Sequence, residues 1–291
     1  MKRILFACSF FIASTMAANA ASVLTSIKPI QLITLEITKG VSTPEVLLGT
    51  NTSPHDYALK PSDVKKIRGS DLVIWFGPNL EAFLTKTLAG QDNVLTLSSL
   101  EGLDLREFES DHHDDGHHHG HHDPHFWLGY KPTLQVAKAI SQRLAKLDEE
   151  HSHEYQKNFD AFSEKLFEQN KQIQAQLENV RSQGYYVFHD AYGYFEDDFG
   201  LKQLGHFTVS PERKPGAKTL IAIRSTLSSG KARCVFSEPQ FTPAVIDSVV
   251  RGSDVNKGVL DPLGSSIEAS PGGYFKFKQM LADSFEKCLA K

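Results

Sequence analysis

The chain has 291 residues, of which 31 are lysine or arginine, 35 are aspartate or glutamate and 13 are histidine, so its net charge is −4 at pH 7. A chain of this balance has no evident basic face, which excludes nucleic acid as the expected partner and is compatible with a cation as ligand. Its length is sufficient for two α/β lobes with cores of their own.

The N-terminal twenty residues have the three parts of an export signal. Met1 is followed by two basic residues, residues 4–17 are mainly apolar, and Ala18-Asn19-Ala20 places small residues where a signal peptidase cleaves. We therefore predict that residues 1–20 are a signal peptide that is removed on export. A membrane anchor would require about twenty apolar residues, so the mature protein is expected to be soluble and not inserted in a membrane.

Short apolar runs alternate with helical segments in the first part of the mature chain. Helices are expected from Pro29 and from Pro61, and strands are expected at residues 23–27, 45–48, 72–76 and 94–97. Strands separated by helices pack as a parallel sheet with helices on its faces. We therefore predict an N-terminal α/β lobe over residues 21–147, with a mainly parallel sheet of roughly four strands.

A run of histidines interrupts this lobe. Eight of the thirteen histidines fall between Asp111 and His125, where they alternate with aspartate and glycine. Imidazole is a common ligand for divalent transition metals, so the run indicates a mobile, metal-handling loop over residues 109–123. The alternative is a solvated loop whose histidines are incidental. The candidates for weak metal binding are His112, His113, His117, His118, His119, His121 and His122.

The segment from Thr133 to Arg181 contains neither glycine nor proline. From Tyr155 onward its apolar residues recur at steps of three, four and seven, which is typical of a helix with one buried face. We predict a break near Asp148 and then one long, rigid linker helix over residues 148–182 that fixes two lobes to each other. An exposed coiled coil is the alternative.

The last part of the chain repeats the alternation of strands and helices. Strands are expected at residues 185–188, 204–209, 234–236 and 259–260. We therefore predict a C-terminal α/β lobe over residues 183–291. Removal of the signal peptide leaves Cys234 and Cys288, which have a single possible pairing in an oxidising compartment. A structural disulfide is expected, and two buried thiols or metal ligation are the alternatives.

Four side chains outside regular structure are candidate metal ligands. His55 and His189 each lie near the end of a predicted strand, His125 closes the histidine run, and Asp261 follows the last predicted strand. Ligands collect at the carboxyl ends of strands in open parallel sheets, so the four can converge in a cleft between the lobes. Spacing alone is a weak signal, because a lone loop histidine is more often hydrogen-bonded than bound to a metal.

The sequence around each of these residues resembles the cluster A-I metal-binding proteins that serve ABC importers. The four signatures, in the family's order, are Ser53–Asp63, Asp123–Leu128, Phe188–Tyr192 and Leu260–Gly264. The likeness extends across almost the whole mature chain. Within the family, four further features resemble the zinc-uptake branch, namely the histidine-rich loop, the Gly205–Val209 segment, the Pro215-Gly216-Ala217 turn and the cysteine pair.

The resemblance implies a monomeric carrier in the periplasm that captures Zn(II) between two lobes and delivers it to the membrane permease of an ABC importer. It implies that His55, His125 and His189 are imidazole ligands and that Asp261 or water completes the site. Pro54 occupies the place of a glutamate ligand of some relatives and cannot ligate through its side chain. The resemblance also links His206 to a second metal site, although an edge-strand histidine with no metal is an equal reading.

Donor chemistry favours zinc over manganese, because three neutral imidazoles form a nitrogen-rich site and manganese prefers more oxygen ligands. Manganese, copper or nickel carriage remains the alternative. Protons compete with the metal for imidazole, so capture should weaken as the pH falls through about 6.5. Asp56 and Asp190, which follow His55 and His189, are candidate hydrogen-bond acceptors for these rings or helix N-caps.

A zinc-dependent hydrolase is the competing functional class, because three histidines and an open position can activate water. The sequence contains neither an HExxH nor a GxSxG motif, so a general base and an oxyanion partner are not indicated. We predict a protein that is not an enzyme. A metal-dependent surface adhesin is a third class, but the signal ends in Ala18-Asn19-Ala20 instead of a lipid-attachment cysteine.

Overall fold

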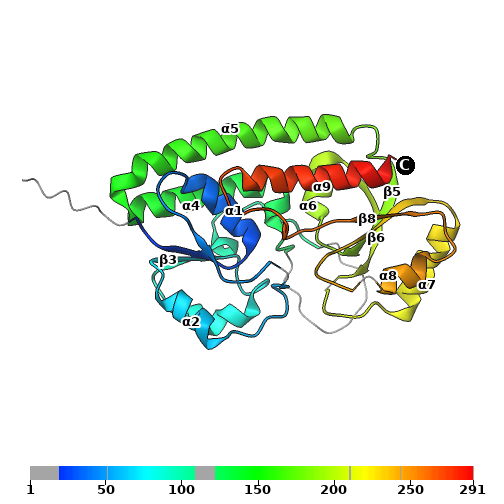
Figure 1. Cartoon of the computed structure of the whole chain (residues 1–291), viewed down its shortest axis with the longest axis horizontal. Helices are drawn as coiled ribbons and strands as arrows, with labels where there is room; N and C mark the ends of the chain where they lie inside the picture. The colour runs from blue at the N-terminus through cyan, green and yellow to red at the C-terminus, as the bar shows by residue number, and fades with distance from the viewer. Residues whose placement is uncertain (1–19, 51, 109–121, 210, 243, 291) are drawn as a thin grey trace, which may run out of the picture.

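The computed structural model describes residues 20–50, 52–108, 122–209, 211–242 and 244–290, which form two α/β lobes (Figure 1). The predicted signal peptide, except for Ala20, lies outside these ranges, as does most of the histidine-rich loop. None of the helices in the described ranges combines the length and the hydropathy that a membrane span requires.

Each lobe is built on a four-stranded parallel sheet, as predicted. The strand order is β2-β1-β3-β4 in the N-terminal lobe and β6-β5-β7-β8 in the C-terminal lobe. The first sheet consists of β1 (Val23–Thr25), β2 (Glu45–Val46), β3 (Leu72–Trp75) and β4 (Val94–Thr96). The second consists of β5 (Gly184–His189), β6 (Lys202–Thr208), β7 (Ala232–Ser237) and β8 (Asn256–Val259).

Helices cover both sheets and follow the predicted alternation. In the N-terminal lobe they are α1 (Lys28–Ile37), α2 (Pro61–Arg68), α3 (Thr85–Leu88) and α4 (Tyr130–Leu147). The long helix α5 (Ser152–Leu177) follows, and then α6 (Gly193–Phe199), α7 (Ala217–Ser228), α8 (Ala244–Val250) and α9 (Gly273–Leu289). Prolines at the first turns of α1 and α2 occupy positions where a helix needs no backbone donor.

Helix α5 has 26 residues and is therefore about 39 Å long. Its buried face consists of Tyr155, Phe162, Leu166, Ile173 and Leu177, which is the periodicity expected from the sequence. The helical structure is interrupted before α5 at Asp148. The carboxylate of Asp148 accepts hydrogen bonds from His151 and from the hydroxyl of Tyr155. The prediction of one long helix that joins the lobes, with a break near Asp148, is confirmed.

A second helix, α9, runs beside α5 along the same side of both lobes (Figure 1). Gln169 donates to the carbonyl of Phe275 at 2.7 Å, and Gln176 donates to Glu286 at 2.7 Å. The sequence predicts that helices alternate with strands in the C-terminal lobe, but it does not predict that one of them lies across both lobes. The predicted disulfide is present, because Cys288 near the end of α9 is bonded to Cys234 of β7. Closing this loop stabilises the fold by about 4 kcal/mol in the chain-entropy description.

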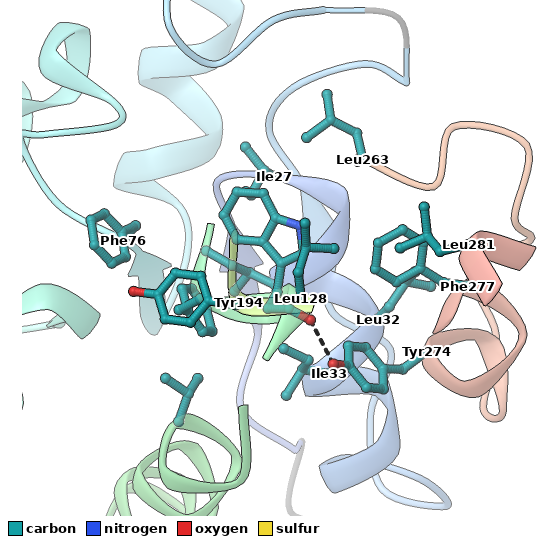
Figure 2. Packing of buried hydrophobic residues seen from close by; sticks show 14 of the residues in the cluster. Ile27, Leu32, Ile33, Phe76, Leu128, Tyr194, Leu263, Tyr274, Phe277 and Leu281 are labelled. Carbon is teal, nitrogen blue, oxygen red and sulfur yellow. Dashed lines mark hydrogen bonds between the residues drawn. The ribbon is translucent and has the colours of Figure 1, made fainter. Parts of the chain in front are cut away.

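The main hydrophobic core continues from one lobe into the other. Residues 126–128, which form a single 3₁₀ turn, lie at this junction. The indole N–H of Trp127 donates to the carbonyl of Pro262 at 2.7 Å, and the hydroxyl of Tyr274 donates to the carbonyl of Trp127 at 2.6 Å. The side chains that pack there include Ile27, Ile33, Leu128, Tyr274, Phe277 and Leu281 (Figure 2). The segment that begins with His125 is therefore held by both lobes.

Candidate metal centre

Three imidazoles from three separate segments meet between the lobes. His55 lies in the loop between β2 and α2, His125 precedes the 3₁₀ turn of residues 126–128, and His189 is the last residue of β5. One ring nitrogen from each lies within 4.8 Å of those of the other two. His125 and His189 are 3% exposed, whereas His55 is half-buried. The sequence therefore identified three residues that the fold brings together.

The loop that contains His55 is fixed by a neighbouring carboxylate. Asp63, in the first turn of α2, accepts hydrogen bonds from the hydroxyl of Tyr57 and from the backbone N–H of Lys60, both at 2.8 Å. The backbone N–H of His55 donates to the hydroxyl of Ser53 at 3.3 Å. These bonds explain why the residues of the Ser53–Asp63 signature occur together, since they shape the turn that presents the imidazole.

The Nε2 atoms of His125 and His189 are 3.4 Å apart. Two nitrogen ligands bound to zinc at 2.0–2.1 Å in a tetrahedral arrangement lie about 3.3 Å from each other. The two rings are therefore already at the separation that a shared zinc ion needs. Because the third imidazole adds a further nitrogen within 4.8 Å, the donor set fits a four-coordinate site with one position left for another ligand.

Each of the two buried rings is oriented by a carboxylate. His125 Nδ1 lies 2.7 Å from Asp123 Oδ1, and His189 Nδ1 lies 2.6 Å from Glu238 Oε1. Such contacts place the proton on Nδ1 and leave Nε2 as the metal-binding atom. The sequence suggested Asp190 as the acceptor for His189, but Glu238 has that position. Glu238 directly follows β7, the neighbour of β5 in the sheet, and an acid at that strand end is the signal that could have indicated it.

Burial and neighbouring charges act differently on the two rings. Burial and the adjacent His189 lower the pKa of His125 well below its usual value. Burial also tends to lower the pKa of His189, but Glu238 outweighs it and the net pKa is raised. Burial raises the pKa of Asp123 to about 7, against the backbone N–H of His125 and the charge of Arg106. Of the two rings, His189 is therefore the one that more readily takes a second proton and becomes charged, whereas His125 stays neutral.

The recess around the imidazoles is small and mainly apolar. Trp127, Phe241 and Leu263 contribute to its walls, and its volume is about 10 Å³. Such a volume is sufficient for about one water-sized particle. Chemically, the arrangement can hold one soft-to-borderline divalent cation through imidazole nitrogens and exclude bulk water from it.

Asp261, the predicted carboxylate of the site, lies outside the group of three imidazoles. It is 6% exposed, and its oxygens are occupied within its own lobe. Oδ1 accepts from the amide of Gln240 at 2.7 Å and from the N–H of Leu263 at 3.1 Å, and Oδ2 accepts from the N–H of Ser265 at 2.6 Å. Its role as a fourth ligand remains a prediction.

Two of the predicted secondary residues, His206 and His122, lie within the described ranges, and neither belongs to the group of three imidazoles. His206, on β6, has its Nδ1 3.8 Å from Asp190 Oδ2, and it does not belong to the imidazole group. His122 pairs with Glu107 in an isolated antiparallel bridge, so the residues that flank positions 109–121 lie side by side. The other loop candidates, His112, His113, His117, His118, His119 and His121, lie outside the described residues.

Comparison with known proteins gives a consistent result for almost the entire chain. Residues 23–288 match the family described as "Zinc-uptake complex component A periplasmic". The chain is 42% identical to the "High-affinity zinc uptake system protein ZnuA" of Yersinia pestis, over 99% of this chain and 98% of that protein. It is also 42% identical to the protein of the same name from Haemophilus ducreyi, over 95% and 96% of the two chains.

A solved structure with the same overall fold is the "Crystal structure of ZnuA". Its TM-score against this chain is 0.80, at 24% sequence identity, and the match covers 93% of this chain and 99% of that one. At this identity the likeness concerns the fold, with two lobes and a long connecting helix.

Proposed function

Because this chain belongs to the ZnuA family of periplasmic zinc-uptake components, we propose that it captures Zn(II) in the periplasm and delivers it to the membrane permease of an ABC importer. The ion is held between the lobes by His55, His125 and His189. The observation that carries this proposal is the 3.4 Å separation of two Nε2 atoms that are each backed by a buried carboxylate.

The donor set favours zinc over manganese as the bound cation. Three imidazole nitrogens and one remaining position match the coordination of zinc, whereas manganese prefers more oxygen ligands. The fourth position is taken by water or by Asp261, and the hydrogen bonds that already occupy Asp261 favour water. Copper and nickel also bind imidazole, so selection against them depends on geometry and supply.

A carrier role, without catalysis, suits the dimensions of the centre. The recess has a volume of about 10 Å³, which holds about one water-sized particle, so a single ion fits among the rings but an ester or a peptide bond does not. Two helices, α5 and α9, join the lobes, which favours release through small motions instead of wide opening. We propose that the protein acts as a soluble monomer that presents both lobes to the permease.

The proposal is tested by zinc titration of the mature protein in competition with a chromogenic zinc chelator. The wild-type protein should hold one zinc ion more tightly than the chelator. The triple variant H55A/H125A/H189A should lose this ion, while H153A, which removes an exposed histidine of α5, should retain it. A tight zinc ion that persists in the triple variant would show that the site lies elsewhere.

Transport is tested in a bacterium that lacks its own periplasmic zinc carrier and produces the permease of this system. The cells are grown in chelator-treated medium. Wild-type protein and H153A should restore growth, and the triple variant should not. Growth restored equally by the triple variant would contradict delivery of zinc from these three ligands.

A further inference from the structure

Arg106 of the N-terminal lobe is hydrogen-bonded to helix α6 of the C-terminal lobe. Its Nε donates to Asp197 Oδ2 at 3.1 Å, and its backbone N–H donates to the hydroxyl of Tyr194 at 2.8 Å. The same hydroxyl donates to the carbonyl of Asp123 at 2.8 Å, and the N–H of Asp123 donates to the carbonyl of Arg106 at 2.7 Å. Residues 106 and 123 are therefore held to each other and to α6.

The guanidinium of Arg106 also lies close to the carboxylate that orients His125. Arg106 Nη1 and Asp123 Oδ2 are 3.8 Å apart. Both atoms are buried, and neither has a hydrogen-bond partner within the described part of the chain. The side chain of Asp123 is 1% exposed. Oδ1 of this carboxylate faces the ring of His125 and Oδ2 faces the guanidinium, so Arg106 lies where its charge can hold the carboxylate in its orientation.

Helix α6 connects this contact to the second buried ligand. It begins at Gly193, only four residues after His189, and residues Tyr194 and Asp197 within it hold Arg106 and Asp123. The guanidinium lies against the first residue of the helix, because a Cβ atom on Gly193 would be 2.5 Å from Cζ and Nη1 of Arg106. The absence of a side chain at this position therefore leaves the space that the guanidinium occupies.

We propose that Arg106 is a positioning residue for zinc capture: clasped by Tyr194 and Asp197, it holds the Asp123 carboxylate against His125 and fixes the distance between His125 and His189. Arg106 acts through Asp123 and does not contact the ion. This inference rests on the proposed function, because it assumes that the two histidines bind the cargo zinc. We therefore expect the contacts of Arg106 with Tyr194, Asp197 and Asp123 to affect zinc affinity although none of these residues binds the ion.

Two variants disrupt the contacts of the Arg106 side chain in different ways. R106Q removes the charge, and G193A keeps the charge but places a methyl group where the guanidinium lies, so that the flexible side chain has to move away. K131Q is the matched control for charge, since Lys131 is exposed and pairs with Asp104 at 2.9 Å on the same lobe. G216A is the control for glycine, because a Cβ there would meet only Thr219 Oγ1 at 3.9 Å.

The affinity of the tight site is measured with zinc itself, by chelator competition. We expect R106Q and G193A to bind zinc about tenfold more weakly than wild type, the lower end of what loss of an outer ligand-orienting group costs. K131Q and G216A should bind as wild type does. In a D123N background R106Q should have no further effect, because the two residues act as one unit. Equal affinity of R106Q and K131Q, or additive effects of R106Q and D123N, would overturn the proposal.

A spectroscopic signal separates positioning from general loss of stability. In the metal-free protein, the Nδ1–H proton of His125 that is bonded to Asp123 should be visible by NMR and absent in H125A. Its resonance should shift in R106Q and G193A and stay unchanged in K131Q and G216A. An unchanged resonance in both R106Q and G193A would overturn the proposal. Failure of the proposed function would be seen separately, as a tight zinc ion that persists in H125A.

Discussion

His125 and His189 face each other through Nε2 atoms that are 3.4 Å apart, while the Nδ1 atom of each ring is bound by a buried carboxylate. A neutral imidazole with its proton on Nδ1 has a lone pair on Nε2. Two such lone pairs repel each other unless a cation lies between them. The two nitrogens can therefore share either one proton, carried by His189, or one divalent ion, so protons and metal compete for the same position.

Replacement of Glu238 by glutamine should weaken zinc binding while it preserves the hydrogen bond to His189. The glutamine oxygen can still accept from Nδ1–H, but the negative charge that increases the basicity of the ring is lost. We expect a decrease in zinc affinity of about 10–100-fold, measured by chelator competition. E168Q, an exposed change on α5, is the control. Wild-type affinity in E238Q would mean that Glu238 only shapes the metal-free site.

The fold could be predicted largely because its buried elements have simple patterns. Strand β3 is a continuous apolar run that is buried on both faces, and it was predicted within one residue of its end. Strand β8 was expected at residues 259–260 but occupies Asn256–Val259. It is an edge strand whose first three residues are Asn256, Lys257 and Gly258, so it lacks the apolar run that identified the others.

The site could be predicted only in part, for a physical reason. The three histidines lie at strand ends or at the end of the histidine run, where position along the chain already indicates a shared edge. Glu238 is 49 residues from His189 and meets it only because β5 and β7 are neighbours in the sheet. The order of strands in a sheet is a tertiary property, and no local pattern determines it. The same limit applies to the contact of Arg106 with α6.

Asp261 gives a direct test of the fourth ligand. Its two oxygens accept hydrogen bonds from Gln240, Leu263 and Ser265, so Asp261 shapes the loop of residues 261–265. Trp127 donates a hydrogen bond to the carbonyl of Pro262 in this loop. We expect D261N to lower the free energy of unfolding of the metal-free protein by about 1–3 kcal/mol, because buried donors lose a charged acceptor. The zinc affinity should change much less than in H189A.

The two quantities are measured by urea unfolding and by chelator competition. Asp254, exposed between α8 and β8, provides the control variant D254N. A loss of zinc affinity in D261N as large as that in H189A, without a change in the unfolding of the metal-free protein, would instead assign Asp261 as the fourth ligand.

Deletion of the histidine run should leave the tight site intact. The residues that flank positions 109–121 are held together, since Glu107 and His122 form a bridge and the N–H of Asp123 donates to the carbonyl of Arg106. A short Gly-Ser-Gly linker in place of residues 111–121 should therefore close the gap. Calorimetry should show that the tight zinc event persists and that the weak events disappear. Loss of the tight event would contradict the assignment of His55, His125 and His189.

Glu81 predicts a pH dependence of stability that is independent of zinc. The carboxyl group is fully buried behind the carboxyl end of β3, where it accepts from the hydroxyl of Ser26 at 2.6 Å and from the N–H of Gly77 at 3.0 Å. Burial raises the pKa of Glu81 to about 7 from its ordinary 4.5, although these hydrogen bonds act in the opposite direction. The folded state therefore binds this proton more tightly than the unfolded state does.

A raised pKa in the folded state stabilises the protein fully below the unfolded value of 4.5, and this stabilisation is lost as the pH rises through about 7. The loss amounts to about 3 kcal/mol. In E81Q the side chain does not titrate, so the difference in unfolding free energy between wild type and E81Q should shift by that amount, against the wild type, between pH 4.5 and pH 7.5. Urea unfolding of the metal-free proteins across this range measures it. A difference that stays constant with pH would mean that the donors of Ser26 and Gly77 outweigh burial and keep Glu81 ionised throughout.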